Sequence, residues 1–375
     1  MLSSLPTLLG ATTAATVALT GVLVVTKLAH REAQRWRGTR SAHYLAAIGE
    51  MLSRRMIPQS TPKAWATDPL FWDALAEYRL LVTGADREHI DRLAAQAGVH
   101  RALVDRSRRR FPASRRLRAA ARLADLATPL QRQHLRSLLA DRSPQVRTQA
   151  VRGLARLRDI ESIPAILDLA RRVSPWEAAR IADALVTIGL AATGAICDWL
   201  DREMERPDCS EETVALAGRI LGSIGDPEAE PTLLRMLRSP NPEWRVTAAS
   251  ALERTGGLNA IEPLLEAIDD HSWQVRARAA VALGAIGGPG VTRAVAGLLY
   301  DPVWWVRQNA ASALSELPGG TDHLIAALEG PDPYAADTAL NQLTISGVLA
   351  EAAERVRAGV ASEKDRRLAA AAAST

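Results

Sequence analysis

The sequence reads DDHSWQVRARAAVALGAIGG over residues 269–288 and DPVWWVRQNAASALSELPGG over residues 301–320. In both stretches a valine precedes an arginine, and small or apolar residues follow at four, seven, eight and eleven positions after the valine. If this valine is called the anchor, equivalent positions occur along the chain at Val146, Glu177, Thr213, Trp244, Val275 and Val306. Their spacings are 31, 36, 31, 31 and 31 residues, so the chain contains an internal repeat.

Each repeat has the pattern of a helix pair. Positions four, seven, eight and eleven after an anchor lie on one face of a helix, and they are occupied by Ala279, Ala282, Leu283 and Ile286 in the clearest case. Twelve residues after an anchor stands Gly189, Gly225, Gly256 or Gly287, where we expect the helix to end in a left-handed conformation. A second helix with an early proline follows, as at 163–167, 231–234 and 261–265. Such pairs bury their apolar faces by stacking on their neighbours.

These units resemble HEAT repeats, specifically the short bacterial variety first associated with phycobilin lyases. The hallmark is an acidic or proline turn, Val-Arg, two alanines and Leu-Gly, and it is clearest in the units beginning at Asp141, Ser239, Asp269 and Asp301. It is weak around Glu177 and Thr213, where no arginine follows the anchor. The resemblance implies an all-α fold, a right-handed α–α superhelical solenoid of HEAT-like or armadillo-like type. Residues 112–139 look like a divergent first pair and residues 331–358 like a degenerate capping pair.

The N-terminal residues have the composition of a membrane span. No charged side chain occurs before Lys27, and residues 5–26 are 22 mostly apolar residues, enough to cross a bilayer as one helix. A cleaved signal peptide and a buried helix are the alternatives, but the segment has no basic side chain before its apolar core. Basic residues follow only on the C-terminal side, at Lys27, Arg31, Arg35, Arg37 and Arg40. We therefore expect one inner-membrane span, with the N-terminus outside and the repeats in the cytoplasm.

The chain of 375 residues divides by these patterns into four parts. They are an anchor (1–30), a basic juxtamembrane segment and helical cap (31–110), the HEAT-like solenoid (111–360) and a frayed alanine-rich tail (361–375). Within the cap we expect helices over 41–56, 68–82 and 86–97, and a loop over 57–66.

The net charge of +4 is the sum of two opposite halves. Residues 27–158 carry 27 Lys and Arg against 11 Asp and Glu, a net +16, whereas residues 159–375 carry 19 against 31, a net −12. An acidic second half argues against a nucleic-acid-binding solenoid.

The usual sequence signatures of catalysis are absent from the chain. There is no phosphate-binding Gly-x-x-x-x-Gly-Lys loop, His-Glu-x-x-His, Cys-x-x-Cys or Gly-x-Ser-x-Gly, and none of the seven histidines precedes a glutamate, as the iron-binding HEAT-like deoxyhypusine hydroxylases would require. The two cysteines, Cys197 and Cys209, suffice for neither a disulfide framework nor a thiolate metal site. We therefore predict no catalytic residue, no cofactor and no metal.

Two sets of arginines call for different interpretations. One arginine follows the anchor in four repeats, near aspartates of the preceding turn, and we interpret this row as a ladder that joins adjacent units: Arg147, Arg245, Arg276 and Arg307. The other set lies outside the repeat and is predicted as a face for anions: Arg106, Arg108, Arg109, Arg110, Arg115, Arg116 and Arg118. A solvated helix face, an anionic membrane, an acidic partner and nucleic acid remain open for it.

Five tryptophans lie within two residues of an anchor and so recur at successive helix starts: Trp176, Trp244, Trp273, Trp304 and Trp305. They either staple each turn or form an edge that binds a partner, because tryptophan is enriched at binding hot spots. Consecutive helical residues point about 100° apart, so we expect one of Trp304 and Trp305 to be buried and the other exposed.

Taken together, these features predict a membrane-tethered scaffold or adaptor that binds a protein partner through the solenoid surface. The layout is similar to that of accessory subunits of membrane glycosyltransferase systems. The alternative is an enzyme that uses the solenoid groove, either a lyase or a DNA glycosylase-like protein.

Overall fold

The computed structural model describes residue 34 and residues 36–56 and 62–373, all of whose regular elements are helices. The chain forms two compact units, which meet between Leu157 and Arg158. The predicted membrane span, residues 5–26, lies outside the described residues.

The first unit consists of the predicted cap, the first repeat-like helix pair and the first helix of the second pair. Its helices are a helix over residues 36–53, α2 (Lys63–Thr67), α3 (Pro69–Leu81), α4 (Gly84–Gln96), α5 (Val99–Arg106), α6 (Ala113–Leu126), η1 (Pro129–Gln131), α7 (Arg132–Leu138) and α8 (Pro144–Arg156). The expected helices of the cap are present, but α2 lies in the segment predicted as a loop and α5 was not predicted. Trp65 explains the short helix α2, because its ring packs on those of Tyr44 and Phe71 at centroid distances of 5.5 and 4.9 Å.

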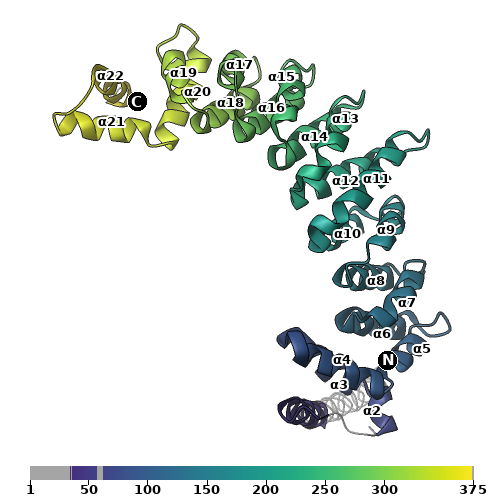
Figure 1. Ribbon diagram of the computed structural model, residues 1–375. Coiled ribbons are helices and arrows are strands. Elements are labelled where there is room, and N and C mark those ends of the chain that lie inside the picture. Colours follow the sequence, from purple (N-terminus) through teal and green to yellow (C-terminus); the bar gives the residue numbers. More distant parts are fainter. Residues whose placement is uncertain (1–33, 35, 57–61, 374–375) are drawn as a thin grey trace, which may run out of the picture. The chain divides into compact units, whose positions relative to one another are not determined.

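The second unit begins with the second helix of the second repeat-like pair and contains the remaining pairs. Its elements are η2 (Ile160–Ser162), α9 (Ile163–Ala170), α10 (Pro175–Ile188), η3 (Gly189–Ala192), α11 (Thr193–Met204), α12 (Glu211–Ile224), η4 (Pro227–Ala229), α13 (Glu230–Leu237), α14 (Pro242–Thr255), η5 (Leu258–Ala260), α15 (Ile261–Ala267), α16 (Trp273–Ile286), α17 (Val291–Gly297), η6 (Leu298–Tyr300), α18 (Trp304–Glu316), α19 (Gly320–Leu328), α20 (Pro333–Ile345), α21 (Val348–Arg357) and α22 (Glu363–Ala373). Within this unit the even-numbered helices α10–α20 pack in series and form one layer, and the odd-numbered helices form a second (Figure 1).

The repeat predicted from the sequence is confirmed by burial. All six anchors are buried, and the leucine eight residues after each anchor is fully buried, from Leu154 to Leu314. Close stacking depends on small residues at the interface. A Cβ added to Gly284 would lie 2.7 Å from the Cβ of Ala313 in the next repeat, and one on Gly222 would lie 2.8 Å from the Cα of Ala251. The helices of adjacent repeats therefore approach until their backbones almost touch.

Helices end at all four predicted glycines, and three of these glycines have the predicted positive φ. Gly189, Gly225 and Gly287 have φ values of 76°, 73° and 67°. Residues with a Cβ adopt such positive φ values only at a cost in conformational energy. At Gly256 the helix ends as predicted, but the predicted left-handed conformation is wrong, since the φ of Gly256 is −73°. Here the requirement is space: a Cβ would lie 2.6 Å from the carbonyl oxygen of Leu252.

The irregular spacing of 36 residues has a local origin in the second unit. Helix α11 has 12 residues, whereas the corresponding helices α9 and α13 have eight each. The extra residues thus extend α11 and the loop that follows it. In the described part of the chain, the stretch Pro175–Met204 is long enough for a membrane span and contains an 18-residue window with a mean hydropathy of 1.5. It is the helix pair α10 and α11, which turns at Gly189 and packs against α9 and α12.

The prediction of a frayed tail is wrong for the described residues up to 373. Residues 363–373 form α22, which packs on α21 and buries Leu368. Asp365 accepts hydrogen bonds from the backbone N–H and hydroxyl of Ser362 at 2.9 and 2.7 Å, and pairs with Arg355 at 2.9 Å. The sequence signal for the start of α22 is a capping box, Ser362-x-x-Asp365, which is easily overlooked beside the alanine-rich residues that follow it.

Candidate binding surfaces

A row of exposed aromatic side chains runs along the starts of successive helices in the second unit. Trp273 begins α16, Trp304 and Trp305 begin α18, and Tyr334 is the second residue of α20. Tyr300 ends the turn η6 before α18. Between 37 and 66% of each side chain is exposed. We call these five residues the aromatic edge. Within this unit α16, α18 and α20 pack in series, so the edge has a fixed spacing.

The sequence missed two members of this edge. Tyr334 stands immediately before the buried Ala335, just as Trp305 stands immediately before the buried anchor Val306. The regular spacing of 31 residues from Val306 points to Asp337, whereas the equivalent buried position is Ala335, 29 residues after Val306, so the register alone misses Tyr334. Tyr300 has no equivalent in the repeat pattern and was identifiable only from the structure. It lines a hollow of about 580 Å³ together with Asp270, His271 and Asp301.

Trp304 and Trp305 are both exposed, at 50 and 56%, which contradicts the expectation that one of them is buried. Their rings lie edge to face, with centroids 4.6 Å apart and an interplanar angle of 74°. Both belong to the first turn of α18. Although their directions differ by about 100°, neither ring is buried, and the first buried side chain of the helix is Val306.

The other two predicted tryptophans do not belong to the edge. Trp244 is buried, and its indole N–H donates to the carbonyl oxygen of Glu211 at 3.3 Å. Its position explains this, because Trp244 occupies the anchor itself. Trp176 is 63% exposed, and the guanidinium of Arg180 lies over its ring at 5.5 Å, but neither of the next two repeats exposes an aromatic residue beside its anchor.

The predicted arginine ladder is confirmed as a structural device. Arg245 and Arg276 form two-point ion pairs with Asp270 and Asp301, whose shortest distances are both 2.7 Å. Their Nη1 groups donate to carbonyl oxygens of the loop before their own helix, at 3.0 and 2.8 Å. Arg147 and Arg307 make the same backbone contacts, at 3.1 and 2.8 Å. Each arginine thus ties its helix to the preceding loop, and two of them also reach the next repeat.

One member of the basic run belongs to this ladder and not to a surface. Arg116 is buried and pairs with Asp141 at 2.9 Å, so the prediction of an anion-binding residue fails there. The spacing could have shown it, because Arg116 and Asp141 are 25 residues apart, as are Arg276 and Asp301.

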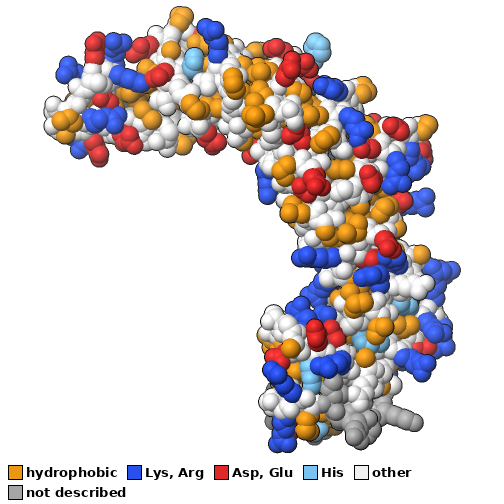
Figure 2. All heavy atoms as spheres, viewed as in Figure 1, with side chains coloured by type: hydrophobic (Ala, Val, Ile, Leu, Met, Phe, Trp, Pro, Cys, Tyr) orange, Lys and Arg blue, Asp and Glu red, His pale blue; other side chains and the backbone are white. Residues whose placement is uncertain are grey.

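The remaining arginines of the run lie at the surface of the first unit, whose Lys and Arg side chains are numerous in Figure 2. Arg108 and Arg110 pair with Asp105 at 3.4 and 2.8 Å. Arg106 donates to the carbonyl oxygen of Thr67 at 3.0 Å, and Arg109 to that of Ala140 at 2.8 Å. Arg115 and Arg118 make no hydrogen bond or ion pair through their guanidinium groups to the described residues.

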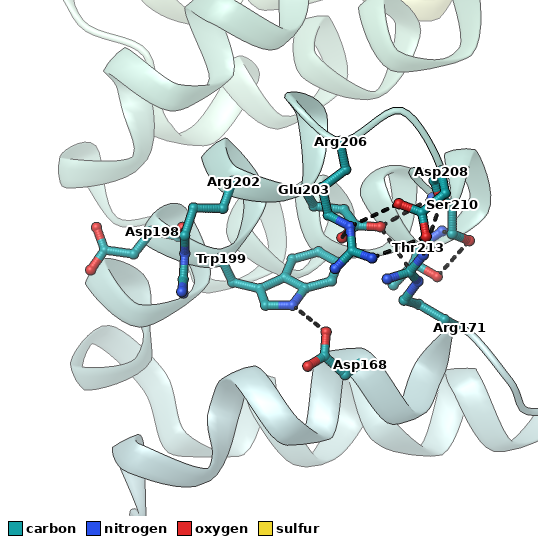
Figure 3. A network of polar contacts seen from close by, with 10 residues as sticks. All are labelled: Asp168, Arg171, Asp198, Trp199, Arg202, Glu203, Arg206, Asp208, Ser210 and Thr213. Carbon is teal, nitrogen blue, oxygen red and sulfur yellow. Dashed lines mark hydrogen bonds and ion pairs between the residues drawn. The ribbon is translucent and has the colours of Figure 1, made fainter.

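A polar network that the sequence did not reveal holds the extended loop after α11 (Figure 3). The carboxylate of Glu203 is buried and accepts from the backbone N–H of Ser210 at 3.1 Å, while Arg171 lies 3.5 Å away. Arg206 pairs with Asp208 at 3.0 Å. Because each buried charge has a partner, the network fastens the loop and leaves no uncompensated group for a ligand.

Neither cysteine is positioned for chemistry in the described structure. Cys197 and Cys209 are free thiols, and burial raises the pKa of Cys197. Among the described residues, no group of three His, Cys, Asp or Glu side chains is placed to hold a metal ion.

Comparison with known families identifies HEAT repeats in this chain. Profiles of HEAT repeats match residues 203–271, 240–315 and 261–329, and a PBS lyase HEAT-like repeat matches residues 146–172. The repeat class predicted from the sequence is therefore confirmed. No curated protein matches the chain by sequence.

Solved structures with a similar fold include two karyopherins. Importin beta is 14% identical, with 88% of this chain and 55% of that chain covered and a TM-score of 0.52. The karyopherin Kap121p bound to the extreme C-terminus of the protein phosphatase Cdc14p is 14% identical, with 88 and 43% covered and a TM-score of 0.51. This chain thus spans about half the length of those karyopherins. The CpcE–CpcF phycocyanin lyase complex of Nostoc sp. PCC7120 is 22% identical, with 66 and 95% covered and a TM-score of 0.35.

Proposed function

We propose that this chain is a non-catalytic scaffold that binds a protein partner through the aromatic edge, and that residues 5–26 tether it to a membrane. The observation that carries the proposal is the aromatic edge itself. Tryptophan and tyrosine dominate binding hot spots because they offer large, rigid apolar surfaces with few rotatable bonds. Here five such side chains are 37–66% exposed, at the starts of stacked helices or in the turn before one of them.

Two further observations support a protein as the occupant. HEAT solenoids bind proteins along their extended surfaces, and a karyopherin of similar fold holds a C-terminal segment of another protein. Residues 159–375 carry a net charge of −12, which favours approach by a partner of net positive charge. We therefore expect a basic, aromatic- or aliphatic-containing segment on the aromatic edge.

Affinity capture of the tagged full chain from detergent-solubilised membranes tests this function. The double variant Trp304→Ala/Trp305→Ala should lose a stoichiometric partner, by about fivefold or more in captured amount, since each hot-spot truncation costs more than about 1 kcal/mol. The matched control replaces exposed leucines of the intra-repeat turns, Leu190→Ala/Leu258→Ala, and should retain the partner.

Stability measurements separate recognition from structural stapling. Because Trp304 and Trp305 are half exposed, their double variant should melt close to the unaltered chain. Trp244→Ala removes a buried ring and should cost about 3–5 kcal/mol. If the edge variant captures the same partners as the leucine control, the aromatic edge is not the binding surface.

The captured partner also decides between finer alternatives. A membrane glycosyltransferase would support the role of accessory subunit. An enzyme acting in the solenoid groove, a lyase or DNA glycosylase-like protein, would instead keep its activity in the aromatic-edge variants.

The membrane tether has its own test. Five basic residues follow the apolar segment, at Lys27, Arg31, Arg35, Arg37 and Arg40, so a reporter fused to the C-terminus should be active in the cytoplasm. Periplasmic activity of the reporter would refute this orientation.

A further inference from the structure

The first unit exposes arginines whose guanidinium groups form no ion pair within its described part, next to an exposed tryptophan. The guanidinium groups of Arg37, Arg115 and Arg118 make no hydrogen bond or ion pair to the described residues, and all three side chains are exposed. Trp36 is 57% exposed. We call these four residues the basic face. They come from the start of the helix over residues 36–53 and from the first turns of α6, which are distant in sequence.

Two adjoining hollows make these residues one surface. Arg118 lines both of them: a hollow of about 620 Å³ that it shares with Trp36 and Arg37, and one of about 450 Å³ that it shares with Phe111 and Arg115. The basic face is therefore continuous across α6 and the juxtamembrane helix.

The acidic side chains in these hollows are already engaged by other arginines. Asp68 pairs with Arg40 at 2.9 Å, Asp73 with Arg122 at 2.6 Å and Asp105 with Arg110 at 2.8 Å. The charges of Arg37, Arg115 and Arg118 thus remain uncompensated within the described part of the unit. Three guanidinium groups around open hollows suit phosphate groups, which accept two parallel N–H donors from one arginine.

The position of this surface along the chain identifies the source of the phosphate. Ten residues separate the end of the apolar segment at Thr26 from Trp36, and ten residues span at most about 35 Å. We propose that the basic face lies against the anionic phospholipid headgroups of the membrane that holds residues 5–26, a proposal that rests on the membrane tether described above. Trp36 then occupies the headgroup level, where tryptophan is enriched.

A bilayer with anionic lipid provides the specific readout. Each arginine near such a surface contributes about fivefold to partitioning, which corresponds to about 1 kcal/mol. Three of them therefore contribute about a hundredfold, and the effect disappears at about 1 M salt, where the Debye length is about 3 Å. Phosphatidylcholine bilayers, which carry no net charge, provide no such attraction.

The test reconstitutes the full chain with lipid vesicles of phosphatidylcholine alone, or with one lipid in three replaced by phosphatidylglycerol. Flotation reports membrane association, and hydrogen–deuterium exchange of the loop residues 107–111 reports docking of the basic face. The variant Arg37→Glu/Arg115→Glu/Arg118→Glu reverses the three positive charges of the basic face. Its matched control, Arg87→Glu/Arg92→Glu/Arg101→Glu, reverses three exposed arginines of the same unit that line neither hollow.

The expected result is flotation with both vesicles, and exchange of loop 107–111 that is about fivefold slower or more only with phosphatidylglycerol. This protection should be lost at high salt and in the basic-face variant, and retained in the control. Flotation with anionic vesicles alone, abolished in the basic-face variant, would support the face and refute the tether.

Two outcomes would overturn the proposal. Flotation with both vesicles and identical exchange would leave the tether standing and refute docking. Salt-sensitive binding of a DNA or RNA duplex through the same three arginines, without protection by anionic vesicles, would assign the face to nucleic acid instead.

Discussion

The ion pair between Arg276 and Asp301 allows a quantitative test of how adjacent repeats are joined. The perturbation is Arg276→Ala, alone and together with Asp301→Ala. The guanidinium donates to the two carboxylate oxygens at 2.7 and 3.0 Å, and to the carbonyl oxygen of Asp270 at 2.8 Å. Only 15% of the arginine side chain and 6% of the aspartate side chain are exposed.

The burial of this ion pair determines how much stability the Arg276→Ala variant should lose. Removing one partner from a buried pair costs about 3–5 kcal/mol because the other charge is left unpaired, whereas an exposed pair contributes less than about 1 kcal/mol. Asp301 would retain one hydrogen bond, from the backbone N–H of Val303 at 2.8 Å, so we expect the lower end, about 3 kcal/mol. Because the double variant leaves no unpaired charge, it should cost no more than Arg276→Ala. The coupling energy should then be at least as large as the cost of Asp301→Ala measured alone, which completes the cycle.

Thermal unfolding of the full chain, followed by far-UV circular dichroism, measures these values. A loss of 3 kcal/mol from a unit of this size corresponds to a decrease of about 6–12 °C in melting temperature. Arg278→Ala is the matched control: Arg278 is exposed on the same helix and makes no hydrogen bond or ion pair with the described residues, so its removal should change stability by less than about 0.5 kcal/mol. Equal effects of the two arginine variants, or additive costs in the double variant, would refute the reasoning.

The pH dependence provides an independent check of the same pair. Burial alone would raise the pKa of Asp301, but the hydrogen bonds from Arg276 and from the Val303 backbone outweigh it and hold this pKa below its ordinary value of 3.8. A depressed pKa contributes stability that is present above the ordinary value and is lost as the pH falls through the folded-state value. The stability difference between the unaltered chain and the double variant should therefore be constant near neutral pH and change only below about pH 4.

Two further predictions concern the core and the tail. Leu283→Asp places a carboxylate at a fully buried position and should cost at least about 5 kcal/mol, destabilising the neighbouring repeats as well; unchanged melting and helix content would show that the repeat register is wrong. Asp365→Ala removes the acceptor that caps α22 and pairs with Arg355, so hydrogen exchange in α22 should become at least about tenfold faster while exchange in α16 stays the same; fast exchange of α22 in the unaltered chain would mean that the tail frays after all.

Periodicity in the sequence was enough to predict the repeat and its core. The anchors and the leucines eight residues later are buried because a stacked helix pair has one apolar face, and that face recurs with the repeat length. The same reasoning gave the arginine ladder, of which Arg245 and Arg276 meet an aspartate of the next repeat. The predictions from the sequence failed at two local features. The alanine-rich composition of the tail hid the Ser362–Asp365 cap, and Gly256 is required by close packing and not by a positive φ.

Only the tertiary structure decided which surface residues are available for binding. Trp244 and Trp305 both lie beside or at an anchor, yet one is buried and the other is exposed, because a single position changes which side of the first turn a ring occupies. Likewise, Arg116 and Arg118 are two residues apart, but the first meets Asp141 in the adjoining loop and the second opens onto two hollows. Sequence spacing determines which residues face the core. Whether a surface charge is neutralised depends on partners from distant loops, which only the folded chain brings together.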